Sequence, residues 1–228
     1  PFFFIDFSSE HFIPQEVTLG HGKFITFPKE SSPELMQIIG YLLGDGHVGE
    51  RCVRFKDLDK DLLFLYKGLI EKVFNIEGRV VRLRGTHAYL LEVNSLPLCN
   101  WLKENVVSRK KELLGEVGQL PREEIAAFLR GLFDAEGYVA LKSGQVCFST
   151  TDADLAKIMS LLFLRFGLIA SSYKRARKEK NWHDTYLICF SNYCSFKNFR
   201  RKIGFSSKEK IRKLEFLIQQ KAKKFIKK

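Results

Sequence analysis

An internal repeat constrains the fold of this chain more than any other feature of its 228 residues. The stretch IIGYLLGDG, residues 38–46, aligns with LRGLFDAEG, residues 129–137, so that Asp45 falls on Glu136 at an offset of 91. Two further matches follow in the same order at offsets of 93 and 97, as expected of one unit duplicated with lengthened loops. They pair FKDLDKDL (55–62) with FSTTDADL (148–155), and YLLEVNS (89–95) with YLICFSN (186–192).

Each repeat is predicted to contain the same series of elements. A helix begins after a capping signal, Ser32-Pro33 in the first repeat and Pro121 in the second, and ends at Gly46 or Gly137 in the left-handed conformation. A β-hairpin, an amphipathic helix, a second hairpin and a closing helix follow. The hairpins are expected at 47–57 and 78–94, then at 138–150 and 171–191, and the amphipathic helices at Asp59 and Asp152.

The predicted fold class is α+β, with two pseudo-two-fold-related αββαββα units and an antiparallel four-stranded sheet in each. The N-terminal segment adds the aromatic, strand-like stretches PFFFIDF and KFITF, which either cover a sheet edge or extend a binding surface. The expected domains are an N-terminal extension (1–31), a first repeat (32–119), a second repeat (120–205) and a basic C-terminal helix (206–228).

Small residues predict how the two repeats pack. Gly40 and Gly44 lie four residues apart on one helix face, and the second repeat has glycine and alanine at the matching positions. Such spacing lets two helix backbones approach closely. Helices packed in this way would bring Asp45 and Glu136 together at their C-terminal ends, where the helix macrodipole disfavours a carboxylate. A divalent cation would neutralise such a pocket.

The net charge of +12 favours a polyanionic partner. Residues 200–228 hold twelve Lys or Arg and two Glu, so most of the excess charge lies in this one segment. It is either a phosphate-binding tail or an ordinary helix with a solvated face, because Ile211, Leu214 and Leu217 recur at helical spacing.

The cysteines favour a reducing compartment, either the cytoplasm or an organelle. The chain has five, an odd number, and none stands in a CxxC pair, so neither a disulfide framework nor a zinc site is expected. No apolar run reaches the length of a membrane span, and PFFFI lacks the basic start of a signal peptide. No membrane partner is therefore expected.

The two repeat motifs resemble the signature motifs of single-chain LAGLIDADG homing endonucleases, and the resemblance extends over residues 32–200. It implies that the acids at the eighth position, Asp45 and Glu136, are the catalytic metal ligands. The backbone carbonyls of Gly44 and Ala135 would help to hold Mg2+, whose place Mn2+ or Ca2+ could also take.

Two positions beside the acids depart from a simple pattern. The sixth position of the first motif is Leu43 where the family pattern has an acid, although the family varies there. Its counterpart, Asp134, lies two residues from Glu136 and hence on another helix face. Asp134 is therefore not expected to bind metal.

The resemblance also implies that the two sheets form a saddle over the major groove of duplex DNA. The period of two along CVRFK directs Val53 and Phe55 toward the helices and leaves Arg54 and Lys56 toward DNA. Arginine can read guanine or grip phosphate, whereas the alternative is an ordinary solvated strand face. The DNA-binding candidates are Arg54, Lys56, Arg82, Arg84, Lys142, Lys174, Arg175 and Arg177.

The implied reaction is double-strand cleavage of long, specific DNA sites by divalent-metal-dependent phosphodiester hydrolysis, which leaves short 3′ overhangs. A basic residue near each acid would stabilise charge on the phosphate. Lys56 in the first repeat and Lys142 in the second are the candidates for this catalytic role. The enzyme is expected to be a monomer, since one chain supplies both halves of the site.

Two other functions fit the same scaffold: an RNA maturase that binds its host intron RNA, and a DNA-binding regulator without catalysis. The presence of both acids argues against the regulator. Many inteins also carry this type of domain, but the sequence starts at Pro1 and ends at Lys228 without the Cys or Ser start and His-Asn end of protein splicing. A free-standing, intron-encoded enzyme is therefore expected.

Overall fold

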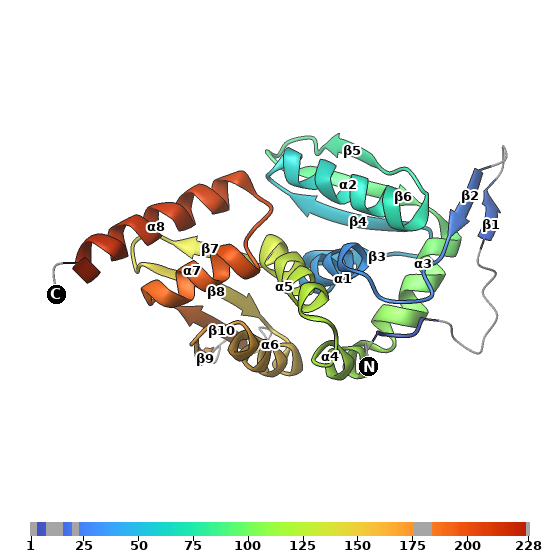
Figure 1. The fold of residues 1–228 in the computed structure, drawn as a ribbon. Helices are drawn as coiled ribbons and strands as arrows, with labels where there is room; N and C mark the ends of the chain where they lie inside the picture. Colours follow the sequence, from blue (N-terminus) through green and yellow to red (C-terminus); the bar gives the residue numbers. More distant parts are fainter. Residues whose placement is uncertain (1–3, 8–15, 20–22, 176–183, 227–228) are drawn as a thin grey trace. The chain divides into compact units, whose positions relative to one another are not determined.

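The computed structural model describes residues 4–7, 16–19, 23–175 and 184–226 (Figure 1). It divides into two compact units, residues 1–131 and 132–228, called here the first and the second unit. The first contains β1 (Glu16–Leu19), β2 (Lys23–Thr26), α1 (Pro33–Asp45), β3 (Gly46–Val48), β4 (Cys52–Asp57), α2 (Lys60–Phe74), β5 (Arg79–Arg82), β6 (Tyr89–Asn94), α3 (Leu96–Leu102), the π-helix η1 (Lys103–Val107), α4 (Lys110–Val117) and most of α5 (Arg122–Ala135).

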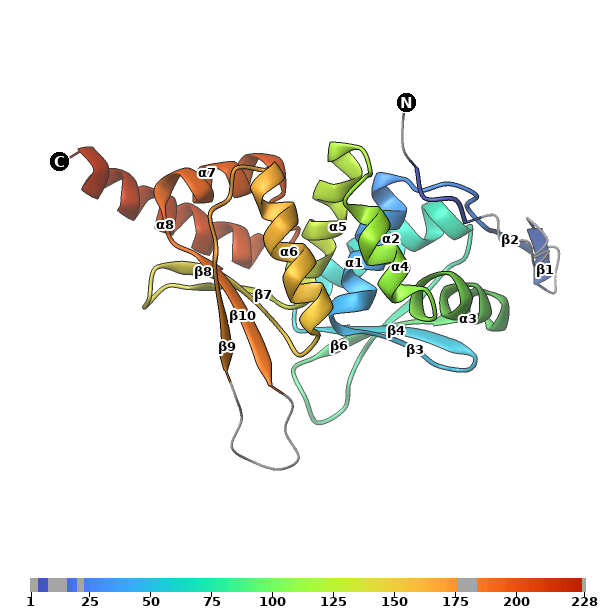
Figure 2. The same cartoon turned by 90° about the horizontal axis from the view of Figure 1, so that it is seen from below.

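The first unit is an antiparallel sheet, in the order β3-β4-β6-β5, with helices α1 and α2 on one face (Figure 2). Three buried aromatic rings join these layers. The Tyr41 ring of α1 lies 5.3 Å from the Phe55 ring of β4 and 4.5 Å from the Tyr66 ring of α2. The helices therefore occupy one face of the sheet, and its other face, the open face, is left without a covering helix.

The N-terminal extension packs within the first unit. Strands β1 and β2 pair only with each other among the described residues, so the extension does not join the edge of a four-stranded sheet. Phe7 and Phe27 instead pack on Trp101 of α3, with ring centroids 5.4 and 6.0 Å away. The segment thus adds to the hydrophobic core behind the sheet.

The second unit repeats this architecture, with a sheet in the order β7-β8-β10-β9 and helices α6 and α7 on one face (Figure 2). Phe133, at the end of α5, is the centre of its core and contacts the rings of Phe148, Phe163 and Phe199 at 5.7, 5.7 and 4.7 Å. The elements are β7 (Gly137–Ala140), β8 (Gln145–Thr150), α6 (Ala153–Arg165), β9 (Ser171–Arg175), β10 (Thr185–Phe190), α7 (Tyr193–Lys202) and α8 (Lys208–Ile226).

The predicted αββαββα repeat is confirmed, as are Ser32, Asp59 and Asp152 as capping residues. Ser32 accepts a hydrogen bond from the Leu35 N–H at the start of α1. Asp59 and Asp152 cap the N-termini of α2 and α6 in the same way. Local capping signals therefore determine where these helices begin.

The basic C-terminal segment forms helix α8, which packs through Leu214 and Leu217 within the second unit. Lys221 of this helix lies beside Gly144 in the turn between β7 and β8. Among the described residues, no helix combines the length and apolar character needed to cross a bilayer.

The expectation that Gly46 and Gly137 are left-handed is wrong. Gly46 has φ −85°, and Gly137 is not among the described glycines with positive φ. Glycine is required for steric reasons, because the strand leaves the helix by folding back over its last turn. A Cβ atom on Gly46 would lie 2.6 Å from the Leu42 Cα, and one on Gly137 would lie 2.6 Å from the Phe133 carbonyl oxygen.

The prediction of close helix packing is confirmed at Gly131. A Cβ atom there would collide with the backbone carbonyl of Gln37 and lie 2.7 Å from the backbone nitrogen of Tyr41. The backbones of α1 and α5 therefore touch at this point, and only glycine leaves room for that approach.

The cysteine count predicted no disulfide, whereas the structure joins Cys147 of β8 to Cys189 of β10. The two residues are direct partners in the antiparallel register, with Cα atoms 4.2 Å apart. Cysteines 42 positions apart leave no local motif, so their juxtaposition depends on strand pairing that residue spacing alone does not report.

Gly131→Ala tests the close approach of α1 and α5. The methyl group meets helix backbone, which cannot rotate away, so we expect the free energy of unfolding to fall by about 1–3 kcal/mol. Gly68→Ala in α2 is the matched control, because no described atom beyond its own helix lies within 4 Å of the place that its methyl group would take. It should raise stability by about 0.5–1 kcal/mol through helix propensity. Chemical denaturation measures both, and equal effects would contradict the packing.

Candidate functional site

Asp45 is the last residue of α1, directly before the first strand of the sheet. No basic residue lies in the last turn of this helix to offset its negative end. Although the side chain reaches solvent, desolvation by the surrounding protein raises the pKa of Asp45. The Lys56 ammonium opposes this shift, and the Asp57 carboxylate adds to it. The fold thus keeps a destabilised carboxylate at this junction.

Lys56 is held beside this carboxylate by β4. Its neighbour Phe55 is the register partner of Gly46, so Lys56 lies diagonally across from the helix end. The Tyr41 hydroxyl lies 3.1 Å from both the Lys56 carbonyl oxygen and an Asp57 carboxylate oxygen. Tyr41 therefore fixes the backbone that carries Lys56 to the helix that carries Asp45.

Glu136 occupies the equivalent junction in the second unit, between α5 and β7. Its N–H donates to the Leu132 carbonyl at 2.9 Å, which continues the helical pattern by one residue. The ammonium of Lys210, from α8, donates to the carbonyl oxygens of Phe133 and Asp134 at 3.1 and 2.6 Å. A lysine from the C-terminal helix thus offsets the negative end of α5 next to Glu136.

Asp134 has a structural role. Its side chain is fully buried and accepts a hydrogen bond from the Ser206 N–H at 2.7 Å. This bond fixes the segment that leads into α8. That Asp134 does not bind metal stays a prediction.

Lys142 is not brought next to Glu136. It is exposed in the turn that follows β7, and a four-residue strand separates it from the helix end by about 13 Å. The register position that Lys56 occupies in the first unit is filled by Ser149 in the second, because Phe148 pairs with Gly137 as Phe55 pairs with Gly46. Lys210 is the cation that the structure places at this end of α5.

The donor set at each junction consists of oxygen atoms. A carboxylate stands next to the last backbone carbonyls of a helix, at Gly44–Asp45 and again at Ala135–Glu136. Hard divalent cations prefer oxygen ligands, and Mg2+ commonly uses one or two carboxylates together with substrate phosphates. Within the described ranges, no three His, Cys, Asp or Glu side chains form a ready-made metal cluster.

The open face of the first sheet carries charged side chains. Val53 and Phe55 are buried beneath the helices and Arg54 and Lys56 are exposed, so the predicted orientation of β4 is confirmed. Glu92 of β6 lies between two arginines, 3.3 Å from the Arg54 Nε and 3.4 Å from an Arg79 Nη.

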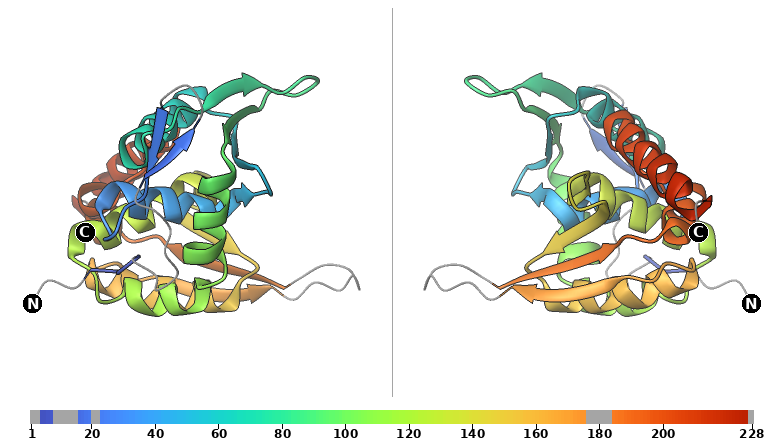
Figure 3. Two further views of the ribbon diagram at one scale, coloured as in Figure 1. Left: turned by 90° about the vertical axis from the view of Figure 1, so that its right-hand side faces the viewer. Right: turned by 90° about the vertical axis from the view of Figure 1, so that its left-hand side faces the viewer.

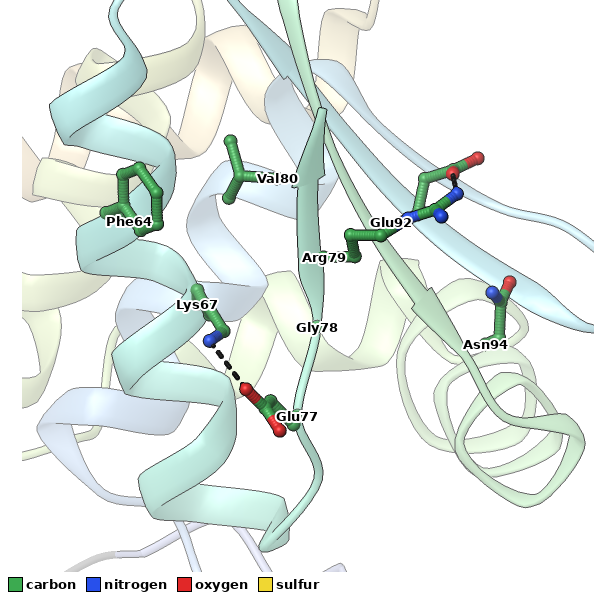
Figure 4. A pocket seen from close by; sticks show the side chains of 8 residues that line it. All are labelled: Phe64, Lys67, Glu77, Gly78, Arg79, Val80, Glu92 and Asn94. Carbon is green, nitrogen blue, oxygen red and sulfur yellow. Dashed lines mark hydrogen bonds and ion pairs between the residues drawn. The ribbon is translucent and has the colours of Figure 1, made fainter. Parts of the chain in front are cut away.

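The orientation predicted for Arg82 is wrong. Figure 4 shows Val80 directed toward Phe64 of α2, whereas Arg79 is directed toward Glu92 on the other side of the sheet. Arg82 lies two residues after Val80, at the end of the strand. Its side chain is therefore on the same side of the sheet as that of Val80, the side that the helices cover. Arg84 lies beyond the strand, in the turn of a hairpin that projects past the helices of its unit (Figure 3).

The second sheet divides the other arginine and lysine candidates between its faces. Arg175 pairs with Thr185 on the open face. Lys174 has the opposite orientation, shared with the buried Ile188, and forms an ion pair with Asp184 at 2.8 Å. Arg177 lies outside the described residues.

Sequence reasoning missed three kinds of residue. Arg79 is identified only from the register of β5 with β6, because that register determines which face of the sheet its side chain occupies. The contact of Lys210 with the end of α5 depends on how α8 packs, which the sequence does not report. The many lysines of that segment did indicate that a basic residue could serve there. The exposed Tyr138 alternates with the buried Gly137 and Val139, a pattern that period-two analysis could have found, whereas Tyr173 lies in a strand whose residues are all exposed.

Comparisons with known proteins identify relatives of this arrangement. Residues 123–204 match the model of a LAGLIDADG-like domain. The chain is 40% identical over 206 residues to a glutamine–fructose-6-phosphate aminotransferase of Methanocaldococcus jannaschii, a match that covers 86% of this chain and 18% of the relative. It is 28% identical over 208 residues to the replication factor C small subunit of the same organism, covering 86% and 11%. The chain therefore spans less than a fifth of these relatives.

The homing endonuclease I-DmoI has the same fold. Its structure in complex with DNA and manganese has a TM-score of 0.57 and 20% sequence identity, and the match covers 77% of this chain and 97% of I-DmoI. Other structures of I-DmoI with DNA contain calcium or were solved in the presence of magnesium. The expected α+β architecture with two four-stranded antiparallel sheets is confirmed.

The environment of Asp45 predicts a pH-dependent stability. A carboxyl group with a raised pKa binds its proton more tightly in the folded state, so stability falls as pH rises through that pKa. Asp45→Asn should therefore be more stable than the parent above the raised pKa, and the gain should vanish below the pKa of the unfolded chain.

Glu34 provides the opposite control, because its hydrogen bond from Lys72 lowers its pKa. Its stabilising effect is present above the pKa of the unfolded chain and is lost as pH falls through the folded value. Glu34→Gln should therefore reduce stability at neutral pH and have no effect in strong acid. Denaturation over a pH series measures both, and effects of the same sign would refute the assignment.

Proposed function

Because this chain belongs to the LAGLIDADG family, we propose that it is a site-specific endonuclease that cleaves both strands of duplex DNA by phosphodiester hydrolysis. The duplex would lie along the open faces of the two sheets. The proposal includes the pairing of Asp45 with Glu136 that the repeat and the family resemblance imply. Divalent metal, Mg2+ with Mn2+ or Ca2+ as alternatives, is part of it.

One observation carries the proposal: each unit ends its signature helix in an acid beside a lysine. In the first unit these residues are Asp45 and Lys56. In the second they are Glu136 and Lys210, which is bound to the helix end two residues earlier. A nuclease needs a carboxylate to hold a cation and a basic group to stabilise charge on the phosphate. Lys56 would supply the basic group in the first unit, whereas Lys210 holds the helix end that carries Glu136.

The acids fit a divalent metal by the chemistry of their donors. Asp45 and Glu136 offer carboxylate oxygens, and Gly44 and Ala135 offer backbone carbonyls at the same helix ends. When bound, such an ion activates water and polarises the phosphate.

The other residues hold and orient the DNA. Lys56, fixed through Tyr41, would place its ammonium against the phosphate near Asp45. Lys210 would act as a positioning residue, because it fixes the end of α5 from which Glu136 projects. Arg54, Arg79 and Arg175 lie on the open faces, where they could contact phosphates or guanine. Contacts by Arg82, Arg84, Lys142, Lys174 and Arg177 stay predictions.

The chain is further proposed to be a segment that inserts into longer proteins. An aminotransferase and a replication factor share no chemistry, yet both contain a stretch similar to most of this chain and make up the rest of their length from other sequence. A segment common to unrelated proteins is better explained by insertion than by a shared activity. Insertion into longer proteins favours an intein-associated endonuclease over an intron-encoded one. It does not add support to the proposal of an RNA maturase.

A cleavage assay tests the proposed activity. The substrate is a duplex enriched from a randomised library by binding to the protein, incubated with Mg2+. We expect a double-strand break with short 3′ overhangs, and we expect Asp45→Asn or Glu136→Gln to abolish it while affinity for the duplex stays within about twofold. Glu123→Gln, an exposed acid in the first turn of α5, is the matched control and should cleave normally.

The same assay separates the alternatives. Binding of the selected duplex without cleavage in Mg2+ or Mn2+ would identify a DNA-binding regulator. Full cleavage by both Asp45→Asn and Glu136→Gln would show that the acids do not carry the reaction. Preference for RNA over every duplex in the library would favour the maturase.

A further inference from the structure

The open faces of the two sheets differ in chemistry although their folds match. In the first unit, one row of register partners crosses the sheet as His47, Arg54, Glu92 and Arg79. Glu92 forms ion pairs with both arginines. Lys56 lies in the next row. This face presents the cations of Arg54, Arg79 and Lys56.

The equivalent row of the second unit is uncharged. Its register partners are Tyr138, Cys147, Cys189 and Ser171. The disulfide between Cys147 and Cys189 thus occupies the place that the Arg54–Glu92 pair has in the first unit.

The next row of the second unit, Ser149, Leu187 and Tyr173, is also uncharged. The two tyrosine side chains are the prominent features of this face, since Tyr138 is 41% and Tyr173 is 54% exposed. On the described part of this face, Arg175 is the one charged residue.

We propose that the two units read different chemistry in their halves of the DNA target: the second unit reads thymine methyl groups, and the first reads guanine and phosphate. This inference rests on the proposed function, and it names the sequence class of the half-site that faces the second unit. Tyr138, Tyr173 and Leu187 are its specificity-determining residues.

The chemistry of the major groove leads to this assignment. Guanine shows two acceptors that suit arginine, and the thymine C5-methyl group is the one apolar group that a base pair presents there. Aromatic and aliphatic side chains gain by covering a methyl group. They offer little to guanine, apart from the tyrosine hydroxyl. The described strands of this face carry one cation and so contribute few phosphate contacts, and the share of affinity that they supply should depend weakly on salt.

The test compares thymine with deoxyuridine, which lacks only the C5-methyl group. A duplex enriched by binding from a randomised library is synthesised with deoxyuridine in place of thymine in one half at a time. We expect substitution in one half to weaken binding about fourfold for each methyl group that is covered. Substitution in the other half should change affinity less than twofold.

Two variants assign the sensitive half to the second unit. Tyr173→Ala and Tyr138→Ala should each lower affinity for the thymine duplex and reduce its loss on deoxyuridine substitution. Leu164→Ala is the matched control, because this exposed apolar residue lies on α6, behind the sheet, and should leave the discrimination intact. In the first unit, Arg54→Ala should lower the slope of binding against salt by about one and leave the deoxyuridine effect unchanged.

The outcomes separate this inference from the proposed function. Failure to enrich any duplex would overturn the proposed function itself. An enriched duplex that is cleaved, but whose halves respond equally to deoxyuridine, would overturn only the inference. Retention of the full deoxyuridine effect in both tyrosine variants would also overturn it.

Discussion

The abrupt turn from helix into strand at Gly46 and Gly137 is the constraint on which the rest of the structure depends. At both places the strand folds back over the last helical turn so closely that a single methyl group would overlap it. The residue just before each glycine must therefore stand where helix and sheet meet. In this chain that residue is Asp45 in one unit and Glu136 in the other.

Each unit compensates for an acid at a negative helix end in its own way. The first unit places Lys56 beside Asp45 from a neighbouring strand and fixes it through the Tyr41 hydroxyl. The second has a serine at the corresponding strand position and uses Lys210 of α8 instead. Asp134 also helps to hold helix α8, because its carboxylate accepts a hydrogen bond from the backbone that leads into this helix. The two units thus repeat the same fold, but the lysine near each acid comes from a different element.

The sequence predicts the architecture well because the signals involved are local or repeated. Ser32, Asp59 and Asp152 cap their helices where capping rules expect them. The repeat then transfers each element from one half of the chain to the other. Buried Val53 and Phe55 fix the orientation of β4, because a strand inside a sheet has a hydrophobic face.

The features that sequence reasoning missed depend on contacts between distant segments. Periodicity places Arg82 on the wrong face because β5 is a short edge strand in which apolar residues have both orientations. The pairing of Cys147 with Cys189 follows from the register of β8 and β10. Lys210 gains its role from the docking of a helix more than seventy residues away in sequence from Asp134.

Manganese binding to the protein–DNA complex tests the central claim, that the acids at the two helix ends hold divalent metal, without relying on cleavage. Electron paramagnetic resonance of Mn2+, titrated into the complex with a selected duplex, counts the bound ions. We predict saturable binding by the parent, and its loss in the Asp45→Asn, Glu136→Gln double variant with DNA affinity retained. The same number of bound ions in parent and double variant would contradict the account.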